Sequence, residues 1–462
     1  MIAFGDVTGN TIHVQKLATS ENQFELFKKL YCLYERVFIL ESLIGPKELS
    51  EMSVIGFDPK LIVTCDSDNF TVKDRNGRIQ QTFSTKEPLS SLRELMPKVN
   101  DERFRYIGGA VGYINYDAIR FWEDLPKRRK KKATKFPLLE FGIYDDGILF
   151  NHKENQAYYF FLGNSRLNEV QQKMADVKYK VAKFSYSTPK RNVRKIDFIR
   201  MVKKAKRYIY QGHIFQVVLA KSINFRIKGN LIDLYAKLRE VNPSPYMYML
   251  KMSRRCIIGS SPEMLIRVTK DRIETFPIAG TRPIEQDEKK NQQLRQEMLE
   301  DEKEIAEHTM LVDLARNDIG RVCEFGTVNV EEFMTVKRFS HVQHIVSHVV
   351  GKMQKKFDSY DCLKAVFPAG TVSGAPKVRA MQIIDELEPT LRGPYAGALG
   401  YFSFNGSCDF AITIRSLFVN GNNAYIESGA GIVIDSDPEL EWAETEHKAN
   451  AILSALKGTA SE

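Results

Sequence analysis

The chain reads Ser428-Gly-Ala-Gly-Ile-Val-Ile-Asp-Ser-Asp-Pro-Glu-Leu-Glu-Trp-Ala-Glu-Thr-Glu-His-Lys448 where an apolar strand, a glycine turn and an acidic helix follow one another directly. Asp437 is a typical N-cap and Pro438 a typical first helical residue, so the helix is expected to begin there. Glu441, Glu444 and the final lysine then share one face, at i, i+3 and i+7. The pattern predicts either an anion and metal site or a capped surface helix with ordinary charge pairs.

A second acidic helix favours the metal site. It is expected to begin near Asp301, where Asp301 followed by Glu304 resembles a capping box, and Glu304 and Glu307 share one face. This face mirrors Glu441 and Glu444, and carboxylates brought together repel one another unless a cation lies between them. Mg²⁺ is the natural candidate, because it prefers oxygen ligands and often uses one or two carboxylates directly. Two separate solvated helix faces remain the alternative on spacing alone.

The composition is that of an ordinary globular protein. The chain has 462 residues, 43% of them hydrophobic and 27% charged, which is enough for two or three domains. We find no signal segment and no apolar run of about 20 residues, so we expect a cytoplasmic protein that does not cross a membrane. The six cysteines form no Cys-x-x-Cys pair and are expected to be reduced thiols.

Part of the formal net charge of +9 is concentrated in the basic run Lys127-Arg-Arg-Lys-Lys-Lys132. A basic nucleic-acid-binding protein is therefore the alternative to an enzyme. The run has no interleaved aromatic residues, and the chain has no helix-turn-helix or zinc-finger spacing. We therefore expect a solvated loop, no nucleic-acid partner, and at most a general preference for anionic ligands.

Two parts of the chain differ in pattern. Residues 1–190 mix short helices with strands such as Leu61-Ile-Val-Thr-Cys65, whereas residues 191–462 alternate longer helices with strands. The polar, basic and proline-bearing residues 185–194 are the expected boundary between an N-terminal mixed region and a C-terminal domain. Hairpin-like runs without a regular β-α-β alternation favour an α+β fold over a doubly wound sheet.

Glycine-bearing segments can supply backbone donors for an anionic ligand. Gly280 and Thr281 are expected at a turn after a strand, and Gly429-Ala430-Gly431 at another turn, where free N–H groups form anion-binding nests. A third segment, residues 367–377, lacks the Gly-x-x-x-x-Gly-Lys-Ser/Thr spacing of a phosphate loop. A nucleoside triphosphate site is therefore excluded.

Three single residues are candidates for chemistry. Arg415 lies in the apolar run 410–418, which is expected to be a largely buried strand. A buried guanidinium there needs a partner, either a carboxylate ligand or a neighbouring acid. Glu263 is expected to end a strand at a turn, where burial can raise the pKa of a carboxyl for use as a general acid. His344 lies in an apolar run, and an isolated histidine there is usually a satisfied core residue.

Taken together, these segments resemble the family of chorismate-utilising enzymes, in its anthranilate synthase branch. The resemblance covers nearly the whole chain and is most specific over residues 195–458. Its motifs are Pro277-Ile-Ala-Gly-Thr-Arg-Pro283, Glu307-His-Thr-Met-Leu-Val-Asp-Leu-Ala-Arg-Asn-Asp318, residues 367–377, Arg392-Gly-Pro-Tyr-Ala-Gly-Ala398 and residues 428–448. The resemblance implies an intertwined α+β fold, with antiparallel sheets packed as a sandwich and helices outside, and a chorismate-binding catalytic domain in residues 191–462.

Two positions separate the chemistries of this family. Isochorismate and salicylate synthases carry a water-activating lysine where this chain has Gln216. Aminodeoxychorismate synthases usually carry a lysine nucleophile where this chain has Ala279, and an alanine cannot form that covalent adduct. The resemblance therefore implies a lyase that attacks chorismate with ammonia and gives anthranilate and pyruvate for tryptophan biosynthesis. Component I of aminodeoxychorismate synthase remains the alternative enzyme.

The resemblance also implies roles for single residues. Glu263 would protonate the departing C4 hydroxyl of chorismate, and His344 with Thr371 would assist the elimination. The Mg²⁺ ligands would be Glu307 and Glu444, supported by Glu304 and Glu441. The substrate would be held by Gly280, Thr281, Tyr395, Arg415, Gly429, Ala430, Gly431 and Lys448.

Two further partners are implied. The chain has no Gly-x-Cys-x-Gly glutaminase elbow, since its nearest match is Val322-Cys-Glu-Phe-Gly326, so a separate glutamine amidotransferase subunit, component II, is expected to supply ammonia. The element Phe38-Ile-Leu-Glu-Ser42 matches one that lines an inhibitory L-tryptophan pocket in the family. The expected tryptophan contacts are Ser42, Pro245, Tyr246 and Met247.

Overall fold

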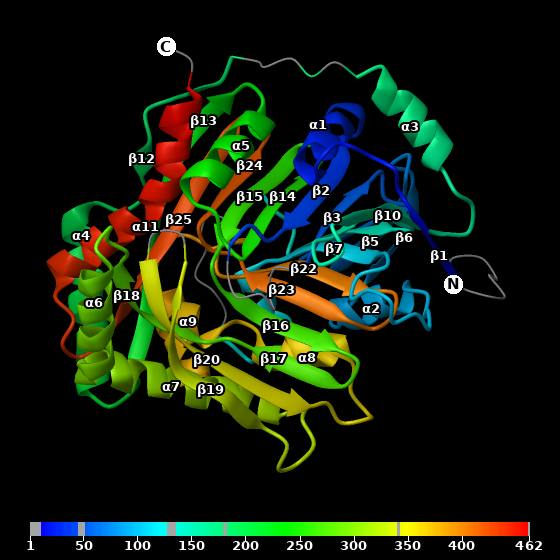
Figure 1. Ribbon diagram of the computed structural model, residues 1–462. Coiled ribbons are helices and arrows are strands. Elements are labelled where there is room, and N and C mark those ends of the chain that lie inside the picture. Colours follow the sequence, from blue (N-terminus) through cyan, green and yellow to red (C-terminus); the bar gives the residue numbers. More distant parts are fainter. Residues whose placement is uncertain are drawn as a thin grey trace.

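The computed structural model describes residues 11–44, 51–126, 135–177, 179, 183–339 and 342–460. The basic run Lys127-Arg-Arg-Lys-Lys-Lys132 lies outside these residues. Within them the strands form two large antiparallel sheets, with the helices on the outside (Figure 1). None of the described helices combines the length and the apolar character needed to span a membrane.

The first sheet has 13 strands in the described part of the chain. Its main path runs β1 (Ile12–Lys16), β10 (Gln156–Leu162), β9 (Asp146–Asn151), β3 (Met52–Phe57), β2 (Arg36–Glu41), β14 (Tyr246–Met252), β15 (Arg255–Ser261), β24 (Ser416–Asn420), β25 (Asn423–Ile432), β13 (Gln216–Lys228) and β11 (Ser185–Tyr186). Two short strands, β12 (Lys190–Arg191) and β21 (Gly374–Ala375), also pair with β13.

The second sheet has 12 strands in the same residues. Its path runs β18 (Ile278–Pro283), β20 (Val342–Lys352), β17 (Arg272–Thr275), β16 (Met264–Thr269), β23 (Cys408–Ile412), β22 (Ala398–Ser403), β7 (Gly109–Ile114), β8 (Leu139–Tyr144), β4 (Leu61–Asp66), β5 (Asn69–Asp74) and β6 (Ile79–Ser84), and β19 (Asn329–Arg338) pairs with β20.

Strands from before and after residue 190 therefore share both sheets, which confirms the intertwined arrangement. The predicted boundary segment, residues 185–194, contributes β11 and β12 to the first sheet. The division of the chain into domains at residue 190 stays a prediction.

The helices follow the amphipathic segments of the sequence. They are α1 (Gln23–Leu33), α2 (Pro88–Glu94), the 3₁₀ helix η1 (Tyr116–Phe121), α3 (Leu167–Ala175), α4 (Lys195–Tyr210), α5 (Leu231–Val241), α6 (Glu288–Glu300), α7 (Glu302–Gly320), α8 (Ser359–Val366), α9 (Gly370–Ser373), α10 (Lys377–Leu387) and α11 (Pro438–Thr459).

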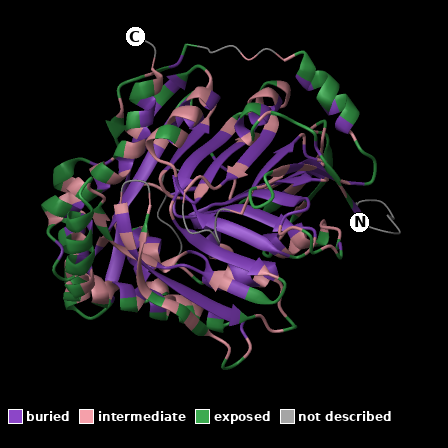
Figure 2. Ribbon diagram, viewed as in Figure 1, coloured by how far each residue is buried: buried purple, intermediate pink, exposed green. Residues whose placement is uncertain are grey.

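The two sheets pack on each other through one large apolar core. Phe38 and Leu250 of the first sheet and Val111, Phe402 and Phe410 of the second belong to it, and each is almost fully buried. A second apolar cluster packs the outer face of the first sheet against α1, α5 and α11. Figure 2 shows the result, with buried strands inside and helices whose outer faces are exposed. This α+β sandwich confirms the predicted fold class.

Two crossings between the sheets lie side by side. The chain leaves β15 of the first sheet and enters β16 of the second through Pro262 and Glu263, and it returns from β23 to β24 through residues 413–415. The Ile412 N–H donates to the Glu263 carbonyl at 3.1 Å, and the Ser260 N–H donates to the Arg415 carbonyl at 3.1 Å. The crossings therefore bring Glu263 and Arg415 to the junction where the sheets part.

The prediction that Arg415 lies within a strand is wrong. The apolar run 410–418 changes sheets, and Arg415 occupies the bend between β23 and β24 with a φ of 50°. A uniform apolar run does not reveal such a change, because both halves are buried strands.

The predicted turn at Gly429-Ala430-Gly431 is also wrong. These residues belong to β25 and pair with β13, Gly429 opposite Ala220 and Gly431 opposite Val218. The glycines are needed for close approach instead of a turn. A Cβ at Gly429 would lie 2.9 Å from the Tyr395 hydroxyl, and one at Gly431 would lie 2.8 Å from Nε2 of Gln216.

The expected turn at Gly280 and Thr281 proves to be an irregularity inside β18. The register against β20 shifts between Ala279 and Arg282, and Gly280 has a φ of 62°. Such a bulge requires the left-handed conformation that glycine adopts without steric cost.

The start of α11 is as predicted. Asp437 caps the helix by accepting hydrogen bonds from the N–H groups of Glu439 and Leu440, and Pro438 is the first helical residue. In α7, Asp301 accepts from the N–H groups of Lys303 and Glu304. The capping box predicted there is only half formed, because the Glu304 side chain accepts from Arg282 instead of from the N-cap backbone.

Candidate active site

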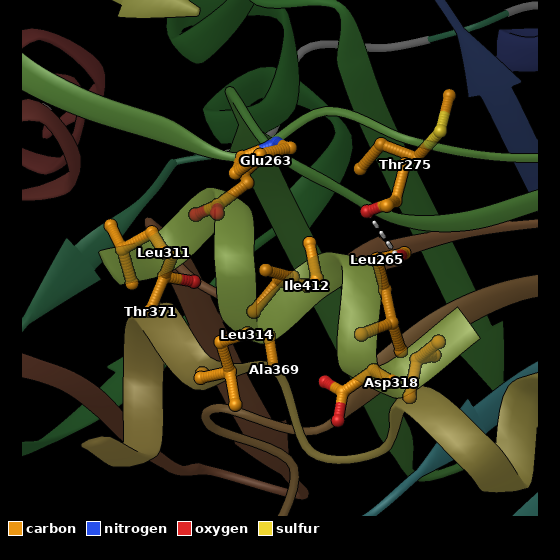
Figure 3. A pocket seen from close by; sticks show the side chains of 14 residues that line it. Glu263, Leu265, Thr275, Leu311, Leu314, Asp318, Ala369, Thr371 and Ile412 are labelled. Carbon is orange, nitrogen blue, oxygen red and sulfur yellow. Dashed lines mark hydrogen bonds between the residues drawn. The ribbon is translucent and has the colours of Figure 1, made fainter. Parts of the chain in front are cut away.

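A pocket of about 380 Å³ opens beside the crossing that carries Glu263. Its lining includes Glu263, Thr371, Leu311, Asp318 and Ile412, drawn from the crossing segment, the second sheet, α7 and α9. In Figure 3, Glu263 and Thr371 lie at the same end of the pocket, whereas Thr275 and Asp318 line the other side. The predicted acid and one of its predicted helpers therefore share a wall.

Glu263 is a buried acid at the wall of this pocket. Its side chain is buried, and burial raises the pKa of its carboxyl to about 8. The Thr371 hydroxyl and the Lys448 charge oppose this shift of the pKa, although the Thr371 hydroxyl is not in ordinary hydrogen-bond geometry. A carboxyl with this pKa is still largely protonated at neutral pH, as a general acid requires.

His344 is held by hydrogen bonds to the bulge in β18. Its Nδ1 lies 2.7 Å from the Gly280 carbonyl oxygen and 3.2 Å from the Thr281 hydroxyl. Because a carbonyl only accepts, Nδ1 carries the hydrogen and the Nε2 lone pair is available. Burial, together with the charges of Arg415 and Lys448, lowers the pKa of His344 to about 4, although the hydrogen bond to the Gly280 carbonyl opposes this shift.

Positive groups face this histidine. Arg415 forms no ion pair within the described residues, and burial lowers the pKa of its guanidinium against the influence of Tyr395 and Glu444. The Lys448 ammonium donates to the Gly429 carbonyl at 3.0 Å and lies 2.5 Å from Glu444. A carboxylate ligand would supply the missing partner of Arg415.

The two acidic helices face each other across the end of β25. Glu307 of α7 accepts from Nε2 of Gln216 at 2.7 Å. Burial raises the pKa of Glu307, and the charges of Glu304 and Glu444 raise it further, while Gln216 opposes them. Burial also raises the pKa of Glu441, and its Oε2 is buried without a hydrogen bond.

The four predicted metal ligands are held by different partners. Among the residues described, no three His, Cys, Asp or Glu side chains are gathered closely enough to hold an ion. Glu304 accepts from Arg282 at 3.1 Å, and Glu444 is paired with Lys448. The facing carboxylates and the unsatisfied oxygen of Glu441 nevertheless suit Mg²⁺, which needs only one or two carboxylates and takes water or substrate oxygens besides. Magnesium binding stays a prediction.

Several residues of the site escaped the sequence reasoning. In the sequence, position 216 is informative only because it holds a glutamine instead of the family's lysine. In the structure, the Gln216 side chain also donates a hydrogen bond to Glu307. Lys377 donates to Asp318 at 2.6 Å and to the Val366 carbonyl at 3.0 Å, which holds the segment that presents Thr371. Asp318 is the last residue of the motif 307–318, and Lys377 is the last residue of the segment 367–377. Neither motif by itself indicates that these two side chains form an ion pair.

A separate pocket of about 510 Å³ lies between the sheets. It brings together the four predicted tryptophan contacts, which are Ser42, Pro245, Tyr246 and Met247. The Ser42 hydroxyl is buried without a hydrogen bond, and the Tyr246 hydroxyl donates to Asp409 at 2.9 Å. Two segments that are far apart in the sequence, one with Ser42 and one with residues 245–247, therefore line the same pocket.

Comparison with known proteins defines the class. Residues 37–454 match the family model of the chorismate binding enzymes, and the chain belongs to that family. The curated relatives include the anthranilate synthase component 1 of Methanothermobacter marburgensis, 46% identical over 98% of this chain and 96% of its own. That of Saccharolobus solfataricus is 41% identical over 96% of this chain and 99% of its own.

Solved structures of related enzymes resemble this fold. The anthranilate synthase component I of Streptococcus pneumoniae superimposes with a TM-score of 0.78 at 33% identity, covering 89% of this chain and 94% of its own. The menaquinone-specific isochorismate synthase of Escherichia coli shares the fold, with a TM-score of 0.72 at 19% identity over 97% of this chain and 95% of its own.

Proposed function

We propose that the chain is the large subunit of an anthranilate synthase, which converts chorismate and ammonia to anthranilate and pyruvate. The named relatives support this function over nearly their full length. The observation that supports this function most directly is which residues occupy positions 216 and 279. Gln216 is bound to Glu307, and Ala279 lies opposite Ile345 next to His344, so neither lysine-dependent reaction has its lysine.

In the proposed reaction ammonia attacks C2 of chorismate and the C4 hydroxyl leaves. Glu263 would donate a proton to this hydroxyl, since burial keeps its carboxyl protonated near neutral pH. The C2 proton then departs and the enolpyruvyl group leaves as pyruvate. Neutral His344, with its Nε2 unprotonated, would assist that elimination together with Thr371.

Charged side chains would orient the two carboxylates of chorismate. Arg415 would pair with the enolpyruvyl carboxylate beside Tyr395 and Gly429, because its guanidinium can form a bidentate pair. Lys448 would lie near the ring carboxylate. Mg²⁺, when bound, would supply positive charge for this ring carboxylate, and Glu307 with Glu444 would hold it.

Ammonia would come from a glutamine amidotransferase subunit. The relatives are named component 1, which implies a second component, and this sequence has no glutaminase nucleophile elbow. L-tryptophan would bind the pocket around Ser42 and inhibit the enzyme. The unsatisfied Ser42 hydroxyl and the apolar Met247 and Pro245 suit its polar head and indole ring.

The test is turnover by the purified chain with chorismate, ammonium chloride and Mg²⁺. We expect anthranilate fluorescence and an equal amount of pyruvate, and no product when glutamine replaces ammonium. Aminodeoxychorismate without pyruvate would favour the alternative enzyme. Absence of chorismate turnover, together with salt-dependent nucleic-acid binding, would favour a basic binding protein instead.

A further inference from the structure

A third cavity, of about 1250 Å³, lies outside the pocket of Glu263. Strands β13, β24 and β25 contribute much of its wall. Its lining combines small polar side chains with aromatic rings and includes Phe136, Ser222, Asn224, Phe225, Tyr425 and Glu427. None of these residues belongs to the candidate active site or to the pocket around Ser42.

Two polar groups of this cavity lack partners. Glu427 is 5% exposed and makes no hydrogen bond or ion pair within the described residues. The hydroxyl of Tyr425, two residues earlier on the same face of β25, is buried without a hydrogen bond as well. Ser222 and Asn224 lie opposite these two residues on β13 and hydrogen-bond each other at 3.0 Å. Unpaired polar groups in the interior cost free energy, so the cavity suits a guest that hydrogen-bonds to both.

The charges around Glu427 favour a positive guest. Glu388, which follows α10, and Asp117 of η1 act on the Glu427 carboxyl as negative groups, and Arg392 opposes them. Arg392 is already engaged, because its guanidinium lies 2.7 Å from the Glu388 carboxylate. Lys135 also lines the cavity, but it is exposed and forms no ion pair within the described residues. Among the described side chains, Glu427 therefore has no cation paired with it.

Aromatic rings make the cavity suitable for an ammonium group on a short aliphatic chain. Phe136 and Tyr425 meet edge to face, with ring centroids 6.3 Å apart, and Phe225 lines the same cavity. The face of an aromatic ring attracts a cation, and the rings also offer apolar surface to methylene groups. An ammonium group carries three N–H donors, which match the Glu427 carboxylate and the Tyr425 hydroxyl oxygen. An anion or an uncharged alcohol lacks this combination.

We propose that this cavity binds a small organic amine in its ammonium form, with the ammonium group held by Glu427 and Tyr425 and the carbon chain against Phe136 and Phe225. The site is separate from the one assigned to chorismate, and its occupation can be measured without any substrate. It therefore stands independently of the proposed function.

Binding of the amine is expected to release a proton from Glu427. Burial and the charges of Glu388 and Asp117 raise the pKa of Glu427 well above its ordinary value, against the opposing charge of Arg392. The carboxyl of the free protein therefore favours its neutral form, whereas an ammonium group beside it favours the carboxylate. The carboxyl O–H bond breaks, its proton passes to the buffer, and the carboxylate pairs with the ammonium group.

The test is calorimetric titration of the full chain at pH 7 with n-butylammonium, n-butyrate and n-butanol, which share one carbon chain and differ in charge. We expect only n-butylammonium to bind, with proton release measured in buffers that differ in ionisation enthalpy. Glu427→Gln keeps the size of the side chain and removes its charge, so it is expected to weaken binding at least about tenfold and to release no proton. Tyr425→Phe removes one acceptor and is expected to weaken binding about threefold or more.

Glu169 of α3 provides a matched control, because its side chain is exposed, and Glu169→Gln is expected to leave binding unchanged. Circular dichroism melting checks that each variant folds. Equal binding of the probes, binding of n-butylammonium that Glu427→Gln leaves unchanged, or no binding of any probe would overturn the amine site. Loss of the proposed function would instead be seen as absence of chorismate turnover, which the titration does not involve.

Discussion

At the residue scale, burial gives the two proposed proton-transfer groups opposite shifts. The Glu263 carboxyl and the His344 imidazole both feel the charge of Lys448, and desolvation favours the uncharged form of each. Burial raises the pKa of Glu263 to about 8 and lowers the pKa of His344 to about 4. Between these values the acid holds its proton and the base has a free lone pair, which is the combination that the elimination needs.

This difference predicts the pH dependence of the rate. Since Glu263 must be protonated, kcat/KM for chorismate at saturating ammonia should fall as pH rises through about 8. Since His344 must be neutral, no loss should occur on lowering the pH from 7 to 5. The measurement is a pH profile corrected for the fraction of free ammonia. Glu263→Gln should lower kcat by a factor of roughly 10² to 10⁴ and abolish the alkaline limb. If kcat/KM of the Glu263→Gln variant still fell above about pH 8, a group other than Glu263 would be responsible for that fall.

Glu444 tests the metal site. Glu444→Gln removes one charge from the facing acidic helices and should weaken Mg²⁺ binding at least about tenfold by calorimetric titration, with a parallel rise in the Mg²⁺ needed for activity. Exposed Glu439 of the same helix is the control, and Glu439→Gln should leave Mg²⁺ binding unchanged. Equal Mg²⁺ affinity in the two variants would remove Glu444 from the metal site.

At the element scale, β25 and α11 show how far local patterns reach. The cap at Asp437 and the shared face of Glu441 and Glu444 follow from residues within one turn of each other, and sequence alone predicts them. The conformation of Gly429 depends on Tyr395, which comes from another segment. The same holds for Arg415, whose bend depends on which sheet receives each half of the run. The local sequence pattern therefore predicts where α11 begins. The strand conformation at Gly429 and the bend at Arg415 depend on tertiary packing.

Gly429 provides the test at this scale. In Gly429→Ala the new Cβ would meet the Tyr395 hydroxyl at 2.9 Å, Val218 at 3.0 Å and the Leu219 carbonyl at 3.1 Å. Because two of these neighbours are packed side chains and one is backbone, we expect a loss of about 1 to 3 kcal/mol in the free energy of unfolding by urea titration, with reduced activity. Gly320→Ala, with no heavy atom within 4 Å, should not destabilise the protein. Equal stability of both variants would contradict the packing described for Gly429.

At the scale of the whole molecule, the shared sheets connect the candidate active site with the proposed tryptophan pocket. The pocket around Ser42 lies between β2 and β14 of the first sheet and β22 and β23 of the second. The candidate active site lies where β15 crosses to β16 and β23 returns to β24. A ligand that changes the spacing of the sheets can therefore act on Glu263 and Arg415 through the crossings. The family pattern in the sequence predicts both pockets, but the crossings that join them require the fold.

Tryptophan inhibition tests this link. Increasing L-tryptophan should lower the initial rate of anthranilate formation, and Ser42→Leu should weaken the inhibition at least about tenfold by filling the pocket, with kcat preserved. L-leucine serves as the ligand control. A flat titration would remove the regulatory role of this pocket and leave the catalytic assignment intact.

The most direct test of the catalytic assignment follows the nitrogen atom. The purified chain is incubated with chorismate, ¹⁵N-ammonium and Mg²⁺, and the products are identified by mass spectrometry. The site built from Glu263, His344 and Arg415 predicts ¹⁵N-anthranilate and pyruvate in equal amounts. Isochorismate, or ¹⁵N-aminodeoxychorismate without pyruvate, would contradict it.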